Sequence, residues 1–139
     1  MRKALFSLWV AGFLAVLAPA AQAEDYVVIV NQDNGNAVNA DFLAKAYRGE
    51  VKSWPAGGAI SVIALADESP TRLAFDKAVL GKSPSQSRAM WAQLAFTGKA
   101  VPPKVVDSDD EVVKAVNGNK NAVGYVSPKA NVSSVKVVK

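Results

Sequence analysis

The sequence contains no cysteine and no histidine among its 139 residues. Without cysteine it can form no disulfide, thiol nucleophile or thiolate metal site, so ordinary packing must hold the fold. Without histidine it has neither a serine–histidine catalytic pair nor a histidine-bound zinc ion. Carboxylates, lysines, arginines, tyrosines and hydroxyls remain, and these suit a binding site better than a catalytic one. We therefore expect a binding protein that is not an enzyme and has no cofactor.

The first 23 residues have the pattern of a secretory signal peptide. Met1-Arg2-Lys3 is a short cationic start, residues 4–18 are apolar apart from Ser7, and Ala21-Gln22-Ala23 offers small residues to a signal peptidase. The apolar run is shorter than the roughly 20 residues that a membrane-spanning helix needs. We predict export with cleavage after Ala23 and no membrane span afterwards. An uncleaved N-terminal anchor is the alternative.

Cleavage would change both the length and the charge of the chain. Removal of 23 of the 139 residues leaves 116, which is the size of one domain, at residues 24–139. Arg2 and Lys3 leave with the signal, so the net charge falls from +4 to +2. Because the remaining lysines are scattered and few aromatic residues lie near them, we expect no nucleic-acid binding.

Strand and helix patterns alternate along the rest of the chain. Apolar runs predict strands at residues 26–30, 60–66, 104–106, 122–126 and 132–138. Capping residues followed by glycine stops predict helices within residues 39–49, 69–81, 83–98 and 108–118. The run at 26–30 is typical of a strand buried on both faces of a parallel sheet. The alternation predicts an α/β domain with a mixed or mostly parallel sheet flanked by helices.

The segment at residues 67–72 (DESPTR), between the second strand and its helix, has the most chemical content. Ligands of α/β proteins gather where strands end and helices begin. An anion could be held by the hydroxyls of Ser69 and Thr71, by free amides of the first turn and by the guanidinium of Arg72. Pro70 removes one amide, and the two acids at the start would accept a proton from a protonated oxyanion but repel a full anion. The alternative is a Ser-Pro helix opening without a ligand.

A second polar group, Asp109-Asp110-Glu111, opens the last predicted helix. Acids in the first turn are typical of a favourable interaction with the helix dipole, and a hard-cation site is the alternative. The polar loop at residues 32–35 lacks the alternating oxygen ligands of a calcium loop. We therefore predict no metal site.

Three segments, taken in order, resemble motifs of the phosphate-type periplasmic substrate-binding proteins of ABC transporters. Residues 46–54 (AYRGEVKSW) are similar to the family signature I-F-x-G-x-x-x-x-W, residues 68–75 (ESPTRLAF) to S-G-T-R-x-x-F, and residues 121–126 (NAVGYV) to G-A-I-G-Y-V. The strand near residue 27 and the polar loop after it also resemble the part of the family that leads into these motifs. Together the segments extend over nearly all of residues 24–139.

The resemblance implies one lobe, the second, of a type II periplasmic-binding-protein fold, located in the periplasm. It implies that Ser69, Thr71 and Arg72 bind phosphate or a similar oxyanion, with an ABC permease as a partner. Pro70 stands where the family has glycine, and the absent lobe would have supplied roughly half of the ligand cage. We expect weak binding unless a homodimer or another lobe-bearing partner covers the site. The alternative is an envelope protein-interaction module that kept the lobe fold and lost the ligand.

Overall fold

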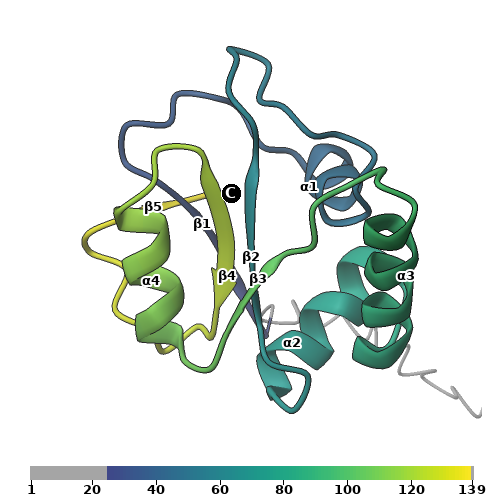
Figure 1. Ribbon diagram of the computed structural model, residues 1–139. Coiled ribbons are helices and arrows are strands. Elements are labelled where there is room, and N and C mark those ends of the chain that lie inside the picture. Colours follow the sequence, from purple (N-terminus) through teal and green to yellow (C-terminus); the bar gives the residue numbers. More distant parts are fainter. Residues whose placement is uncertain (1–24, 139) are drawn as a thin grey trace, which may run out of the picture.

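The computed structural model describes residues 25–138, so the predicted signal segment 1–23 lies outside the described residues. Within the described part, helices cover both faces of one five-stranded sheet (Figure 1). In chain order the elements are β1 (Val27–Val30), α1 (Ala40–Tyr47), β2 (Ser61–Leu65), α2 (Pro70–Phe75), η1 (Asp76–Leu80), α3 (Pro84–Phe96), β3 (Lys104–Val106), α4 (Asp109–Asn117), β4 (Ala122–Val126) and β5 (Lys136–Val137).

The strand order is β3-β2-β4-β1-β5. β2 is parallel to β3 and β4, whereas β1 is antiparallel to both β4 and β5. The mixed sheet confirms the predicted α/β fold. The expectation that β1 belongs to a parallel pair was wrong. Its apolar run reflects burial on both faces, which the covering helices impose whatever the strand direction.

The helices begin where the capping residues predict. The side chains of Asn39, Ser69, Ser83 and Ser108 each accept a hydrogen bond from an amide of the first turn that follows. Ser83 and Gln86 form a complete capping box. At α4 the Ser108 side chain caps the helix, but the Glu111 carboxylate accepts from the amide of Asp107 and not from that of Ser108, so a complete capping box does not form.

An aromatic cluster packs against the C-terminal end of β2, the strand that leads into the candidate site. The rings of Phe75 and Tyr125 are stacked with centroids 3.9 Å apart, and Tyr47 meets Phe75 edge-on at 4.7 Å. The Tyr47 hydroxyl donates to the Ile63 carbonyl at 2.7 Å, and the Tyr125 hydroxyl accepts from the Leu65 amide at 3.2 Å. Burial raises the pKa of both phenols, so the Tyr47 hydroxyl keeps the proton that it donates to Ile63.

On the opposite face α4 packs directly onto β4. A Cβ atom at Gly124 would lie 2.7 Å from Cγ1 of Val112, so only glycine allows this close approach. The Asn31 side chain donates to the carbonyls of Val116 and Asn117 at the end of α4. The carboxylate of Asp109, at its start, accepts from the amide of Ser127 at 3.1 Å and from its hydroxyl at 2.8 Å. Both ends of α4 are therefore tied to the sheet.

Two elements differ from the sequence prediction. The helix that follows Ser69 changes to π-type winding over Asp76–Leu80 before it stops at Gly81. The predicted final strand at 132–138 is reduced to Lys136–Val137, because turn hydrogen bonds occupy residues 131–135. No helix within residues 25–138 is long and apolar enough to cross a membrane.

Candidate functional site

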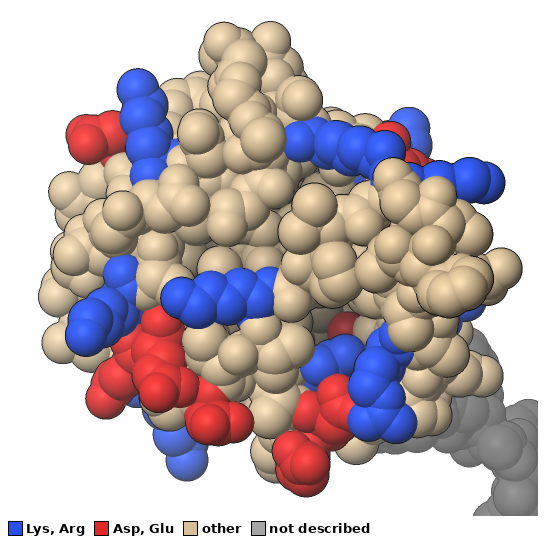
Figure 2. Space-filling view, viewed as in Figure 1, with Lys and Arg blue, Asp and Glu red and all other residues tan. Residues whose placement is uncertain are grey.

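The three parallel strands of the sheet end at the same edge. β2, β3 and β4 end at Leu65, Val106 and Val126, and the turns that follow carry Asp67 to Ser69, Asp107 to Glu111, and Ser127. Figure 2 shows acidic side chains gathered along this lower rim of the molecule. The edge at which ligands of α/β folds bind therefore holds hydroxyls and helix starts among several carboxylates.

Ser69 lies at the start of α2 and caps it. Its Oγ accepts from the Arg72 amide at 3.3 Å, and its own proton has no acceptor in the described residues. The residue lines a hollow of about 410 Å³, which Asp67, Glu68 and the start of α3 also border. Neither Thr71 nor Arg72 lines that hollow. Of the three predicted ligand residues, only Ser69 therefore lines the hollow, and its hydroxyl is free to donate.

Arg72 is buried, with 5% of its surface exposed. Its Nε lies 3.2 Å from Oδ2 of Asp76, and Nη1 lies 2.9 Å from both Oδ1 of Asp67 and the Leu65 carbonyl. Nη2 donates to the Ser87 hydroxyl at 3.3 Å. Four acceptors therefore share the five N–H donors of one guanidinium. The Arg72 side chain therefore connects the end of β2, the π-type turn and α3.

Asp67 connects this buried network to the surface. Its second carboxylate oxygen forms a short contact with Arg88 on α3, whose side chain is exposed. The two arginines and the two aspartates leave the cluster without net charge. Burial raises the pKa of Asp76, and the bond from Arg72 opposes this shift. The charges of the cluster are therefore matched internally.

The arrangement offers an anion hydroxyl donors and the start of α2, but little uncompensated positive charge. Asp67 and Glu68 border the same hollow as Ser69 and repel a fully ionised anion. An oxyanion that keeps a proton can donate it to a carboxylate while Ser69 donates to another of its oxygens. No group of three or more acidic side chains within residues 25–138 is placed to hold a metal ion.

Sequence reasoning identified the segment at 67–72 but missed most of the network behind it. The four-residue spacing of Arg72 and Asp76 on one helix was a usable signal for an ion pair. Ser87 and Arg88 come from α3, and nothing in the local sequence shows that α3 packs against this turn. The burial of Arg72 is therefore a tertiary effect.

Comparisons with known proteins agree with the fold. A family model described as PBP superfamily domain matches residues 20–135. Among curated proteins, none matches the sequence. An ABC-type phosphate transport receptor from Vibrio cholerae has a similar structure, with a TM-score of 0.64 and 24% identity over 83% of this chain and 45% of that one.

Two further solved structures are similar. One is described as a phosphate ABC transporter substrate-binding protein, with bound phosphate, from Clostridium perfringens; its TM-score is 0.65 and its identity 25%, over 83% of this chain and 44% of that one. The other, PstS from Borrelia burgdorferi, gives 0.64 and 16%, over 83% of this chain and 46% of that one. The chain therefore spans less than half the length of the structures it matches.

Proposed function

The chain belongs to the PBP superfamily, and from this premise we propose that it is exported and that this lobe binds phosphate or a similar oxyanion. In this proposal residues 1–23 direct export to the periplasm and residues 24–139 form the binding lobe. The observation that carries the proposal is the free Ser69 hydroxyl at the start of α2, in a hollow of about 410 Å³ at the carboxyl edge of the sheet.

The three predicted residues take different roles in this proposal. Ser69 donates its hydroxyl proton to the anion. Thr71, half-buried in the same first turn but outside the lining of the hollow, is a secondary donor whose side chain must turn toward the anion. Arg72 does not line the hollow; its guanidinium holds the Asp67 carboxylate at 2.9 Å and so fixes the group that accepts a proton from the anion. Pro70 has no backbone N–H group. Side-chain hydroxyls therefore replace one of the backbone donors that a helix start would otherwise offer an anion.

The acids beside Ser69 determine which anion is favoured. Asp67 and Glu68 disfavour an oxyanion that has lost all its protons, whereas phosphate at neutral pH keeps at least one proton and can donate it to a carboxylate. Sulfate has no such proton. We expect phosphate to bind more tightly than sulfate, and binding to weaken as the pH rises and phosphate loses its second proton.

A single lobe leaves the anion open to water on one side. Because desolvation of a charged group is compensated only by close polar partners, we expect an affinity in the millimolar range for the isolated lobe. An ABC permease, a second copy of the chain or another lobe-bearing protein would raise the affinity by covering the hollow. These partners are part of the proposal.

Titration calorimetry with phosphate and sulfate tests the proposal on wild type and on the Ser69→Ala/Thr71→Ala double variant. We expect saturable phosphate binding by wild type and at least a tenfold loss in the double variant. Arg72 is left in place because its removal would unpair buried carboxylates. Ser108→Ala is the matched control, since it removes an equivalent helix cap from α4 without touching the hollow. No saturable binding of either anion would reject the proposal.

A second candidate function is supported by a specific observation. The charge of Arg72 is already balanced by Asp67 and Asp76, and the apolar side chains of Phe96 and Val101 are 93% and 86% exposed. Both features suit an envelope protein-interaction module that kept the lobe and lost the ligand. Affinity capture from envelope extract distinguishes the two, because a stoichiometric partner captured equally with and without phosphate favours the module.

A further inference from the structure

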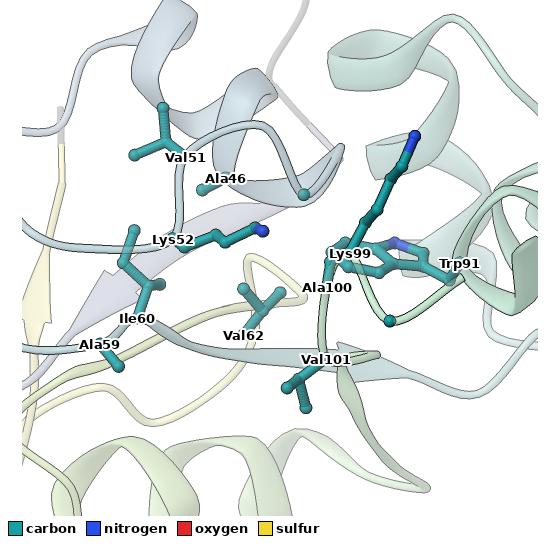
Figure 3. Close-up of a pocket in the computed structure, with 12 residues that line it drawn as sticks. Ala46, Val51, Lys52, Ala59, Ile60, Val62, Trp91, Lys99, Ala100 and Val101 are labelled. Atoms are coloured by element: carbon teal, nitrogen blue, oxygen red, sulfur yellow. The ribbon is translucent and has the colours of Figure 1, made fainter. Parts of the chain in front are cut away.

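A cavity of about 440 Å³ lies at the other end of β2 from Ser69. It is enclosed by the end of α1 with the segment after it, by Ile60 and Val62 at the start of β2, and by Trp91 with the segment that follows α3 (Figure 3). Its volume is within the range of roughly 300–1,000 Å³ that small-molecule sites occupy. The separation along β2 makes it a different place from the proposed oxyanion site.

The wall of the cavity is apolar and set by close packing. A Cβ atom at Gly49 would lie 3.2 Å from Cζ3 of Trp91 and 3.1 Å from Cδ1 of Leu94, so the absence of a side chain at Gly49 lets the end of α1 approach α3. Trp91 is 6% exposed, and its ring lines the cavity. The wall therefore offers a largely apolar surface that includes an aromatic ring.

The charged residues of the lining are two lysines, Lys52 and Lys99, and no carboxylate lines the cavity. Neither ammonium group takes part in an ion pair within residues 25–138. Figure 3 shows Lys52 reaching across the cavity toward Trp91, while Lys99 leaves the wall beside Trp91 and points away from Lys52. Positive charge without a counter-ion thus borders an apolar floor, in contrast to the acidic edge beside Ser69.

We propose that this cavity binds a small organic anion with a flat apolar body, of the class of aromatic carboxylates and sulfonates. The apolar body packs on Trp91, Ile60 and Val62, and the acidic group lies at the mouth beside the Lys52 ammonium, with Lys99 adding positive charge at the rim. Inorganic phosphate lacks the apolar body that would displace water from this floor. The ligand class therefore differs from that of the Ser69 hollow, and the proposal does not depend on it.

Amide and indole NMR spectra of the purified protein, titrated with 1-naphthalenesulfonate, test the proposal. We expect saturable shifts at the Trp91 indole and at the amides of residues 49–52 and 98–101, and none at residues 69–72. The neutral alcohol 1-naphthalenemethanol, which has the same body without the charge, should bind at least fivefold more weakly. Inorganic sulfate, which has the charge without the body, should produce no saturable shift in this cavity.

The Lys52→Gln/Lys99→Gln double variant should bind the sulfonate roughly tenfold more weakly, because the contact to Lys52 and the positive charge of Lys99 at the rim are both lost. Lys129→Gln removes an exposed charge elsewhere and should bind as wild type does. Lys52→Arg/Lys99→Arg keeps both charges and should retain most of the affinity. Both lysines are exposed, so these variants should fold.

Three results would overturn the assignment. The first is the absence of saturable shifts at residues 49–52 and 98–101, and the second is equal sulfonate affinity in wild type and in the Gln variant. The third is a concentration-dependent dimer that shifts the same amides without any added anion, because a second copy of the chain would then occupy the cavity. A failure of phosphate to bind at Ser69 would leave all three tests unchanged.

Discussion

The two proposed anion sites on this lobe use their cations in opposite ways. Arg72, beside the Ser69 hollow, is buried and shared by four acceptors, two of which are carboxylates. Lys52 and Lys99, at the opposite end of β2, are exposed and take part in no ion pair in the described residues. Arg72 therefore connects secondary-structure elements, whereas Lys52 and Lys99 are available to a ligand.

This difference shows that a cation in a recognisable motif is not by itself a measure of anion affinity. The guanidinium of Arg72 is held between two aspartates that compensate its charge, so the proposed oxyanion site has to rely on hydroxyl donors. The cavity near Trp91 has the reverse composition, with free charge over an apolar floor. The two regions therefore suit ligands of different chemistry, and stability measurements can separate them.

The largest expected effect is that of Arg72→Met. Removal of the guanidinium leaves the buried carboxylate of Asp76 and the partly buried carboxylate of Asp67 without their shared partner. Breaking a buried pair on one side costs about 3–5 kcal/mol. Urea unfolding at neutral pH should show a loss of this size, whereas Arg88→Met, which removes an exposed partner of Asp67, should cost less than about 1 kcal/mol. Equal losses in the two variants would contradict the structural role of Arg72.

Gly49→Ala should have the next largest effect and acts on the other region. Gly49 has a φ of +73°, in the left-handed region, and an added methyl group would lie 3.1–3.2 Å from Leu94, Ala100 and Trp91. The strained conformation costs roughly 1–2 kcal/mol, and the contacts would push α1 away from α3. Thermal unfolding measures the loss, and binding of 1-naphthalenesulfonate should weaken as the cavity changes shape. The matched control is Gly81→Ala at a φ of +63°, outside the cavity, where the added methyl group meets nothing within 4 Å; it should share the strain and leave sulfonate binding unchanged.

A smaller effect concerns the pH dependence of stability. Burial raises the pKa of Asp76 in the folded protein above its value in the unfolded chain, so the folded state holds the proton more tightly. The stability from this group is present below the ordinary aspartate pKa and is lost as the pH rises through the raised value. In Asp76→Asn this loss should disappear from urea unfolding curves recorded over that pH window. The control variant Asp41→Asn, at an exposed aspartate, should show the same loss of stability with rising pH as wild type does.

The smallest effect is expected at the free cations. Lys52→Gln and Lys99→Gln break no ion pair within the described residues, so each should change the free energy of unfolding by less than about 0.5 kcal/mol. A loss of more than about 1 kcal/mol in either variant would show that these lysines stabilise the fold, and the contrast with Arg72 would disappear.

Much of the fold followed from the local sequence, because its signals are local. Asn39, Ser69, Ser83 and Ser108 mark helix starts by side-chain capping, and the apolar runs at 26–30, 60–66 and 122–126 mark the central strands. Strand direction was not encoded in this way. The pairing of β1 with β4 and β5 depends on how the chain returns to the sheet, and burial on both faces looks the same in either direction.

The candidate site was less predictable because its character depends on contacts between distant elements. The sequence places Ser69, Thr71 and Arg72 in one turn, but only packing of α3 shows that Ser87 accepts from Arg72 and that Arg88 pairs with Asp67. The cavity likewise combines Lys52, Trp91 and Lys99 from three segments, none of which has an anion-binding pattern of its own.

The most direct test of the central claim is an amide NMR titration of the purified protein with phosphate, followed at Ser69, Thr71 and Arg72. The proposed function predicts saturable shifts at these three amides, weaker at higher pH and absent in the Ser69→Ala/Thr71→Ala variant. Unchanged amides at millimolar phosphate would contradict an oxyanion site at the start of α2.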